Sequence, residues 1–187
     1  MRCIDTAIPE VKIIEPRLFR DARGYFCETY NRKSFLELGI DTEFVQDNES
    51  FSQHGVVRGL HYQKGEHAQA KLVRVLQGEV LDIAVDIRVG SPTFGKHVAV
   101  RLSGENHLQF FIPKGFAHGF AVLSEKALFA YKCDALYAPK AEGSINANDA
   151  EVDIDWIVPP ERRLFSEKDL KAQTFAEYLS HPDFIYG

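Results

Sequence analysis

The sequence predicts a mainly β jelly roll with short peripheral helices. First, hydrophobic and polar side chains alternate between about residues 72 and 133, as in Leu81–Ile87 and Val98–Leu102, the period of strands with one buried face. Second, turn-forming clusters at Val89–Pro92, Ser103–Asn106 and Ile112–Gly115 separate these runs at the even spacing of a sandwich or barrel. Third, 187 residues with 45% hydrophobic content suit one domain, residues 1–187, around a single core.

Two short helices are expected at the edges of this barrel. Asn31–Gly39 begins with a capping asparagine and ends with a glycine, which is typical of a two-turn helix. Ser166 opens the second helix, with Asp169 three residues later in a capping-box-like start. Between them, residues 140–165 contain a proline pair and little periodicity, so we expect an extended loop laid over the barrel.

Charge and composition exclude several classes of protein. A net charge of -5 opposes nucleic-acid binding, which depends on neutralising phosphates. The acidic excess lies in residues 142–187, whereas residues 54–74 are rich in basic side chains, which suits a small anion. No apolar run is long enough to span a membrane, and the first residues lack the core of a signal peptide, so we expect a cytoplasmic protein without membrane contact.

The three cysteines give no sign of a disulfide framework or zinc site. Cys3, Cys27 and Cys133 are an odd number without a C-x-x-C pair. We therefore expect them to be small buried hydrophobic residues.

A polar cluster between Gly55 and Gly78 resembles a metal motif that has lost its metal. The cupin double-stranded β-helix barrel carries a histidine pair, a carboxylate and a glycine in one motif, and P-x-G-x-x-H in another. The second motif is present and ends at His118, but Lys71 stands where the carboxylate ligand of the first belongs. A protonated lysine has no lone pair for a metal. The sequence therefore predicts a cupin barrel with no metal, in which a cation can stabilise negative charge on a substrate oxygen.

Ordered runs along nearly the whole chain resemble the dTDP-4-dehydrorhamnose 3,5-epimerase family, whose members are cofactor-free cupin enzymes of dTDP-L-rhamnose synthesis for cell-surface polysaccharides. The matching runs are Phe19–Glu28, Phe44–Asn48, Arg58–Gln63, Ala68–Val75, Gly78–Val80, Val85–Arg88, Pro113–Phe120, Tyr131–Cys133 and Leu164–Asp169. The resemblance implies an isomerase that inverts C3 and C5 of a 4-keto sugar nucleotide. Both carbons flank the C4 carbonyl, so loss of either proton gives an enolate.

The resemblance also implies a role for each site residue. His61 matches the base, Asp169 the residue that orients it, Tyr131 the acid on the opposite face and Lys71 the group near the enolate oxygen. Substrate binding carries over to Arg23, Glu28, Gln46, Asn48, Arg58, Lys71, His118, Glu142 and Lys168. A homodimer is implied too, with an N-terminal strand that joins the partner's sheet and contributes to its pocket.

The residues alone leave other interpretations open. Asp169 would also be favoured near a helix start by capping, and Tyr131 alternates with Phe129 and Cys133 as a core aromatic would. His54 and His67 are expected at the surface. The family's usual Gly and Trp after Glu142 are Ser144 and Ala147 here, which questions the binding role of Glu142.

Three other functions also remain open. A relative that inverts only C3 or C5 would keep the same base. A metal-dependent cupin would use the same barrel, and a non-catalytic module would bind a sugar nucleotide without exchanging protons.

Overall fold

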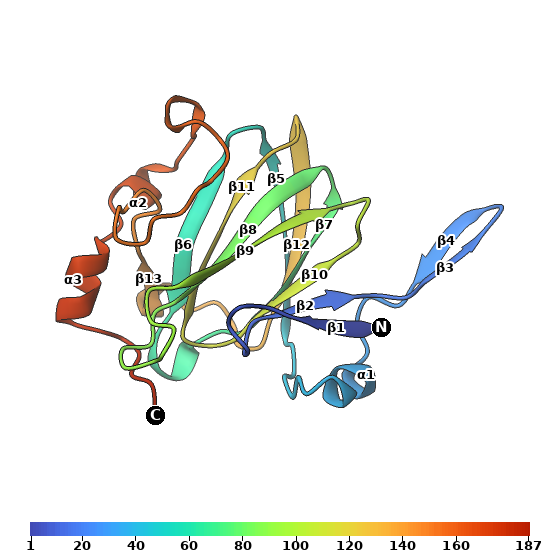
Figure 1. Ribbon diagram of the computed structural model, residues 1–187, viewed down its shortest axis with the longest axis horizontal. Helices are drawn as coiled ribbons and strands as arrows, with labels where there is room; N and C mark the ends of the chain where they lie inside the picture. Colours follow the sequence, from blue (N-terminus) through green and yellow to red (C-terminus); the bar gives the residue numbers. More distant parts are fainter.

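The computed structural model describes all residues from Met1 to Gly187 and shows two antiparallel β-sheets packed face to face (Figure 1). The six-stranded sheet has the order β1 (Arg2–Asp5), β2 (Lys12–Glu15), β10 (Gln109–Ile112), β7 (Lys71–Gln77), β12 (Lys126–Cys133) and β5 (Gln46–Gln53). The five-stranded sheet has the order β13 (Glu142–Ser144), β6 (Val57–Gln63), β11 (Phe116–Val122), β8 (Glu79–Asp86) and β9 (His97–Ser103). This arrangement confirms the mainly β jelly roll.

The remaining strands, β3 (Leu18–Asp21) and β4 (Gly24–Cys27), pair only with each other. They form a hairpin that projects away from the two sheets (Figure 1). Its aromatic side chains Phe19, Tyr25 and Phe26 are all at least half exposed.

The helices are short and peripheral, as the sequence predicts. α1 (Arg32–Glu37) is capped by the Asn31 side chain, and α2 (Glu167–Leu170) by Ser166, which accepts the backbone N–H of Asp169. A third helix that was not expected, α3 (Phe175–Ser180), begins with a full capping box formed by Thr174 and Glu177. Single 3₁₀ turns occur at Gly65–His67, Pro139–Ala141 and Pro160–Arg162, and no helix is long and apolar enough to cross a bilayer.

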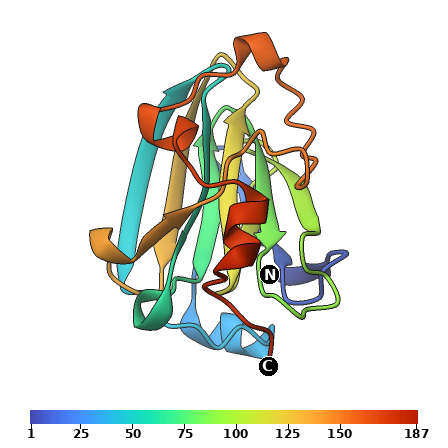
Figure 2. The same ribbon diagram turned by 90° about the vertical axis from the view of Figure 1, so that its left-hand side faces the viewer.

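Three apolar clusters hold these layers together. The first lies between the sheets and includes Val73, Phe110 and Phe129. The second lies on the outer face of the five-stranded sheet, where residues 145–184 supply Trp156 and Tyr178 (Figure 2). The third packs α1 and the residues after it against the outer face of the six-stranded sheet. Burial of apolar surface on both sides of each sheet is the main stabilising contribution.

The expectation of one buried face is correct for β9 but wrong for β8. In β9 the residues Val98, Val100 and Leu102 are buried while Ala99 and Arg101 are exposed. In β8 both faces are buried. The apolar residues of the alternation, Leu81, Ile83 and Val85, lie on the outer face of the sheet, where the C-terminal segment covers them. The polar positions Asp82 and Asp86 consequently point inward and are fully buried.

The expectation of a plain loop over residues 140–165 needs correction as well. Glu142–Ser144 form β13, which pairs with β6 at the edge of the five-stranded sheet. The rest of the segment is mostly irregular and lies over the outer face of that sheet (Figure 2). All three cysteines are free thiols, of which Cys133 is buried and Cys3 and Cys27 are half-buried.

Candidate active site

A cavity of about 310 Å³ opens between the two sheets at the end where β6, β7, β12 and β5 meet. Its lining brings together residues far apart in the chain: Gln46, Asn48, His61, Tyr62, Gln63, Gln69, Lys71, Tyr131, Cys133, Tyr137 and Glu142. Sheet register explains this convergence. Lys71 pairs with Cys133, Tyr131 pairs with Asn48, and Ser144 pairs with His61.

His61 is held by a carboxylate from the far end of the chain. Its Nε2 lies 2.5 Å from Oδ1 of Asp169, which is 5% exposed. The other carboxylate oxygen accepts a hydrogen bond from the Ser166 hydroxyl at 2.8 Å. Burial acts to raise the pKa of Asp169, but the hydrogen bonds from His61 and Ser166 outweigh it and lower the pKa. The ionised carboxylate therefore fixes a proton on Nε2 and leaves the lone pair on Nδ1.

Lys71 and Tyr131 face the same cavity from the opposite sheet. Burial lowers the pKa of the half-buried Lys71 ammonium, against the attraction of Cys133, Asp82 and Glu142. Burial also raises the pKa of Tyr131, which keeps the phenol protonated. The exposed Arg58 bonds Ser52 through Nε at 3.1 Å and lies close enough to act on the Tyr131 charge. The arrangement supplies a base, a proton donor and a cation around one cavity.

The mouth of the cavity is polar and internally bonded. The Glu142 carboxylate forms an ion pair with Lys168 and accepts a hydrogen bond from the Tyr137 hydroxyl at 3.0 Å. Burial raises the pKa of Glu142, but these two partners outweigh it and lower the pKa. On the β5 side, the Gln46 amide donates to Asn48 at 2.9 Å, and its oxygen accepts the backbone N–H of Tyr137 at 2.9 Å.

His118 lies directly opposite His61 on the neighbouring strand β11. It is buried, and its Nε2 lies 2.9 Å from Oδ1 of Asp82. Glycines allow β6 and β11 to approach closely at this point, because a Cβ at Gly59 would lie 2.5 Å from the Cα of Gly119. No group of three or more His, Cys, Asp or Glu side chains converges so as to hold a metal ion.

Five of the nine expected binding residues are outside the lining of this cavity. Arg58, His118 and Lys168 still neighbour residues of the site, whereas Arg23 and Glu28 do not. Arg23 lies in the β3–β4 hairpin, where it pairs with Asp21 at 2.5 Å and its side chain is 90% exposed. Glu28 is exposed and accepts a hydrogen bond from Asn31. The hairpin extends away from the sheets (Figure 1), so within one chain these residues are separate from the His61 site.

The family model described as dTDP-4-dehydrorhamnose 3,5-epimerase matches residues 5–177. The chain belongs to this family. It is 57% identical over 157 residues to the epimerase of Salmonella typhimurium, with 83% of this chain and 86% of that protein covered. It is 52% identical over 178 residues to that of Shigella flexneri, with 95% and 97% covered.

Solved structures of epimerases have the same fold. The dTDP-6-deoxy-D-glucose-3,5-epimerase of Legionella pneumophila, solved in complex with dTDP-4-keto-L-rhamnose, has a TM-score of 0.94 at 52% identity, with 100% of this chain and 98% of that chain covered. A 3'-monoepimerase from Streptomyces bikiniensis, in complex with dTDP-quinovose, has a TM-score of 0.88 at 31% identity, with 94% and 89% covered. The fold thus accommodates both double and single epimerases.

Where the sequence departs from the family pattern, the structure keeps Glu142 at the cavity. Ala147 is buried, and its carbonyl accepts a hydrogen bond from the indole N–H of the fully buried Trp156 at 2.8 Å. A tryptophan from further along the chain therefore packs beside the position where the family usually has its own. β13 still pairs with β6, which holds Glu142 opposite Gln63.

Several residues at the site carry no clear signal in the sequence. Tyr137, Gln63, Gln69 and Cys133 line the cavity without having been assigned a role. The signal for Cys133 was its alternation with Tyr131 on one strand, which places both side chains on one face. Tyr137 carried no comparable signal, because it lies in the loop after β12. His67 and His54 are at the surface, as expected.

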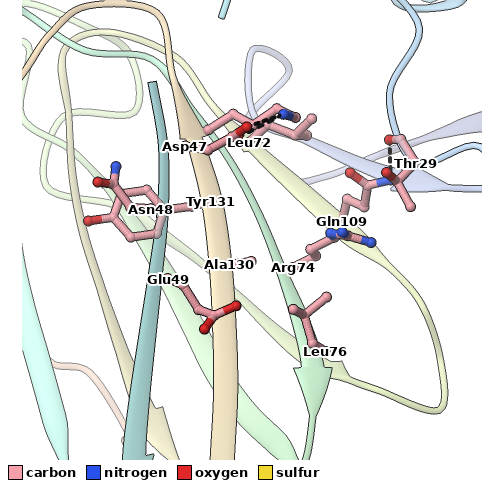
Figure 3. Close-up of a pocket in the computed structure, with 11 residues that line it drawn as sticks. Thr29, Asp47, Asn48, Glu49, Leu72, Arg74, Leu76, Gln109, Ala130 and Tyr131 are labelled. Atoms are coloured by element: carbon pink, nitrogen blue, oxygen red, sulfur yellow. Dashed lines mark hydrogen bonds and ion pairs between the residues drawn. The ribbon is translucent and has the colours of Figure 1, made fainter. Parts of the chain in front are cut away.

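A second groove, of about 330 Å³, lies along the six-stranded sheet (Figure 3). Arg74, Leu76 and Gln109 line it, together with Glu49 and an Asp47–Lys132 ion pair of 2.7 Å. Tyr131 and Asn48 also border this groove, but their side chains point away from Arg74 and Gln109 in Figure 3. The groove lies on the outer face of this sheet, where Phe51 is 62% exposed.

Proposed function

We propose that this chain inverts C3 and C5 of dTDP-4-dehydro-6-deoxy-D-glucose to give dTDP-4-dehydro-L-rhamnose, acting as one catalytic domain without a metal or organic cofactor. The observation that carries the proposal is the His61–Asp169 pair facing Lys71 and Tyr131 across one cavity. The extent of the family match supports the substrate and the single domain.

Proton removal is assigned to His61. The lone pair on Nδ1 takes the proton from the carbon next to the C4 carbonyl, and the C–H electron pair becomes the enolate. Asp169 stabilises the imidazolium that forms, since its carboxylate contacts the other ring nitrogen. The Lys71 ammonium stabilises the negative charge that develops on O4.

Reprotonation is assigned to Tyr131. Its phenol is kept protonated by burial, and it gives its proton to the carbon from the face opposite His61. The phenolate then regains a proton as the imidazolium loses one to solvent. The same sequence of steps at the second carbon completes the double inversion.

Binding of the nucleotide diphosphate is assigned to the basic side chains at the cavity mouth. Arg58 lies near enough for its charge to act on Tyr131, and Lys168 pairs with Glu142 at the mouth. Guanidinium and ammonium groups pair well with phosphate oxygens. Lys168 is paired with Glu142, and binding a phosphate would exchange that carboxylate for a phosphate oxygen. Gln46, Asn48 and His118 are assigned to the sugar and nucleoside.

A homodimer completes the site in this proposal, with Arg23 and Glu28 acting in the partner's cavity. Two features support it. The β3–β4 hairpin projects away from its own sheets (Figure 1) and exposes three aromatic side chains. The second groove lies on the outer face of the six-stranded sheet, where Phe51 is exposed (Figure 3). The cytoplasmic location and the place in cell-surface polysaccharide synthesis stay predictions from the sequence.

Subunit complementation tests the shared site. Arg23→Ala and His61→Asn are each expected to be inactive, and mixing them under exchange should restore about a quarter of the parent rate. The reason is that half of the randomly formed dimers are mixed and each has one intact cavity. Activity that stays absent in verified mixed dimers would place Arg23 outside the partner's cavity.

Deuterium incorporation tests the reaction itself. Incubation of dTDP-4-dehydro-6-deoxy-D-glucose in D₂O should give product labelled at both C3 and C5, and His61→Asn should abolish uptake. A single labelled position would identify a mono-epimerase. Nucleotide binding without any label would identify a binding module, and stoichiometric metal by elemental analysis would favour a metal-dependent cupin.

A further inference from the structure

Asp82 is a fully buried carboxyl inside the sandwich with one oxygen unpartnered. It lies on β8 between the inward-facing core residues Val80 and Ala84. Its Oδ1 lies 2.9 Å from Nε2 of His118. Its Oδ2 is buried without any hydrogen-bond partner. A carboxylate oxygen in such a place is strongly disfavoured unless a cation lies near it.

Lys71, on β7 of the opposite sheet, is near enough for its charge to act on this carboxylate. Asp82 feels the charges of His118 and Lys71, and Lys71 in turn feels those of Cys133, Asp82 and Glu142. Of these three, Glu142 is already paired with Lys168 and Tyr137 at the mouth. Burial raises the pKa of the Cys133 thiol to about 11, so it is uncharged near neutral pH. Asp82 is therefore the negative charge left to balance Lys71.

We propose that Asp82 is a positioning residue for the epimerisation: held by the Nε2–H of His118, its carboxylate is the buried counter-charge that keeps the Lys71 ammonium protonated and directed into the cavity. The inference rests on the proposed role of Lys71 at the enolate oxygen. It also gives His118 a defined task, which is to donate to Asp82.

Burial and mutual attraction act in opposite directions on this pair. Burial raises the pKa of Asp82 and lowers that of Lys71, and the charge of each group opposes that effect on the other. Burial also lowers the pKa of His118 despite the nearby carboxylate, which favours a neutral ring that donates through Nε2. With a neutral His118, Asp82 and Lys71 ionised together leave no net charge inside the barrel. The other titratable groups facing this space are His61 and Tyr62 on β6, Tyr131 on β12 and Tyr137 at the mouth. The pKa of each of these three tyrosines is raised, so none of them supplies a competing anion.

The first test replaces the charge and keeps the shape. In Asp82→Asn the side-chain oxygen can still accept from His118, but the counter-charge is gone. We expect the pH at which Lys71 becomes reactive to fall by about 1 unit, with turnover reduced about tenfold near neutral pH. The pH dependence of Lys71 acetylation by acetic anhydride, followed by mass spectrometry of its peptide, reports the titration directly.

Asp86→Asn is the matched control for this test. Asp86 is also fully buried on β8, but it bonds Arg88, Ser91 and Thr93. Asp86→Asn should leave the pH dependence of Lys71 acetylation the same as in the parent. An identical Lys71 titration in Asp82→Asn and the parent would overturn the inference. A shifted titration with unchanged turnover would overturn the assignment of Lys71 to the enolate oxygen.

A stability cycle tests the pairing without any need for turnover. Lys71→Met removes the cation and leaves Asp82 without its counter-charge, which is strongly destabilising for a buried carboxylate. Adding Asp82→Asn to Lys71→Met should therefore raise the thermal unfolding midpoint, whereas the same substitution in the parent should lower it. If Asp82→Asn lowers the midpoint equally in both backgrounds, Asp82 and Lys71 are not coupled.

Discussion

Asp169→Asn isolates the contribution of one buried carboxylate to proton removal. Asparagine has nearly the same shape, and the backbone N–H of residue 169 can still donate to the Ser166 hydroxyl that caps α2. What disappears is the negative charge 2.5 Å from Nε2 of His61. The imidazolium that forms when His61 accepts the substrate proton then has no counter-charge, and the imidazole can adopt the wrong tautomer.

The size of the effect follows from this geometry. Two unit charges centred about 4 Å apart attract by about 4 kcal/mol at an effective dielectric constant of about 20. Since about 1.4 kcal/mol corresponds to tenfold in rate, full loss would slow proton removal by about 10³. The His61 side chain is 30% exposed, and solvent screening weakens the interaction. We therefore expect turnover to fall by about 10²- to 10³-fold, with substrate affinity little changed.

The measurement is the initial rate of deuterium entry at C3 and C5, followed by NMR, alongside nucleotide binding by calorimetry. Asp149→Asn is a suitable control, because the Asp149 carboxylate accepts the backbone N–H of Phe175 at the start of α3, away from the cavity. It should lose some stability and keep its turnover. A rate for Asp169→Asn within about threefold of the parent would refute an electrostatic role for Asp169.

Four further predictions concern the acid, the core, pH and strand packing. Tyr131→Phe should keep deuterium exchange at the His61 face while product formation falls by about 100-fold or more, as seen by NMR of the reaction. Trp156→Ala should lower the free energy of unfolding in urea by about 3–5 kcal/mol, because this side chain is fully buried. Burial raises the pKa of Asp86, but the hydrogen bonds from Arg88, Ser91 and Thr93 outweigh it and lower the pKa below the ordinary 3.8. The ionised Asp86 therefore stabilises the fold fully above pH 3.8, and this stabilisation is lost as the pH falls through the lower folded-state pKa. Asp86→Asn should consequently make the urea midpoint depend less on pH in the acid range. Gly59→Ala should destabilise the protein and slow turnover, because its φ is +125° and the added Cβ would lie 2.5 Å from Gly119, a loss that circular dichroism and rate measurements would detect.

The local elements were predictable because their signals are local. The alternation in β9, the asparagine cap of α1 and the serine cap of α2 are all present as the sequence indicates. The interior of the barrel was not predictable in the same way. β8 has apolar residues on one face and Asp82 on the other, which reads as a half-exposed strand. In the folded protein the distant C-terminal segment packs Trp156 and Tyr178 onto the apolar face of β8, so the face that carries Asp82 points into the sandwich.

In the candidate site too, residues on paired strands were predictable and residues placed by loops or by the hairpin were not. His61, Lys71 and Tyr131 were assigned by resemblance, and strand register brings them to one cavity. Arg23 and Glu28 were assigned in the same way, but their position depends on where a projecting hairpin docks, which a single chain does not determine. Tyr137 was missed because a loop residue carries no period, and its bond to Glu142 exists only in three dimensions.

The contact between His61 and Asp169 joins residues 108 positions apart in the chain. On a ribosome the barrel strands emerge well before residue 169 does, so a nascent chain holds its base, its cation and its phenol before it acquires the carboxylate that orients the base. A chain clipped ahead of α2 would lose Asp169, the Lys168 partner of Glu142 and the Phe175 and Tyr178 side chains that cover the five-stranded sheet. Turnover thus reports that the C-terminal segment has docked.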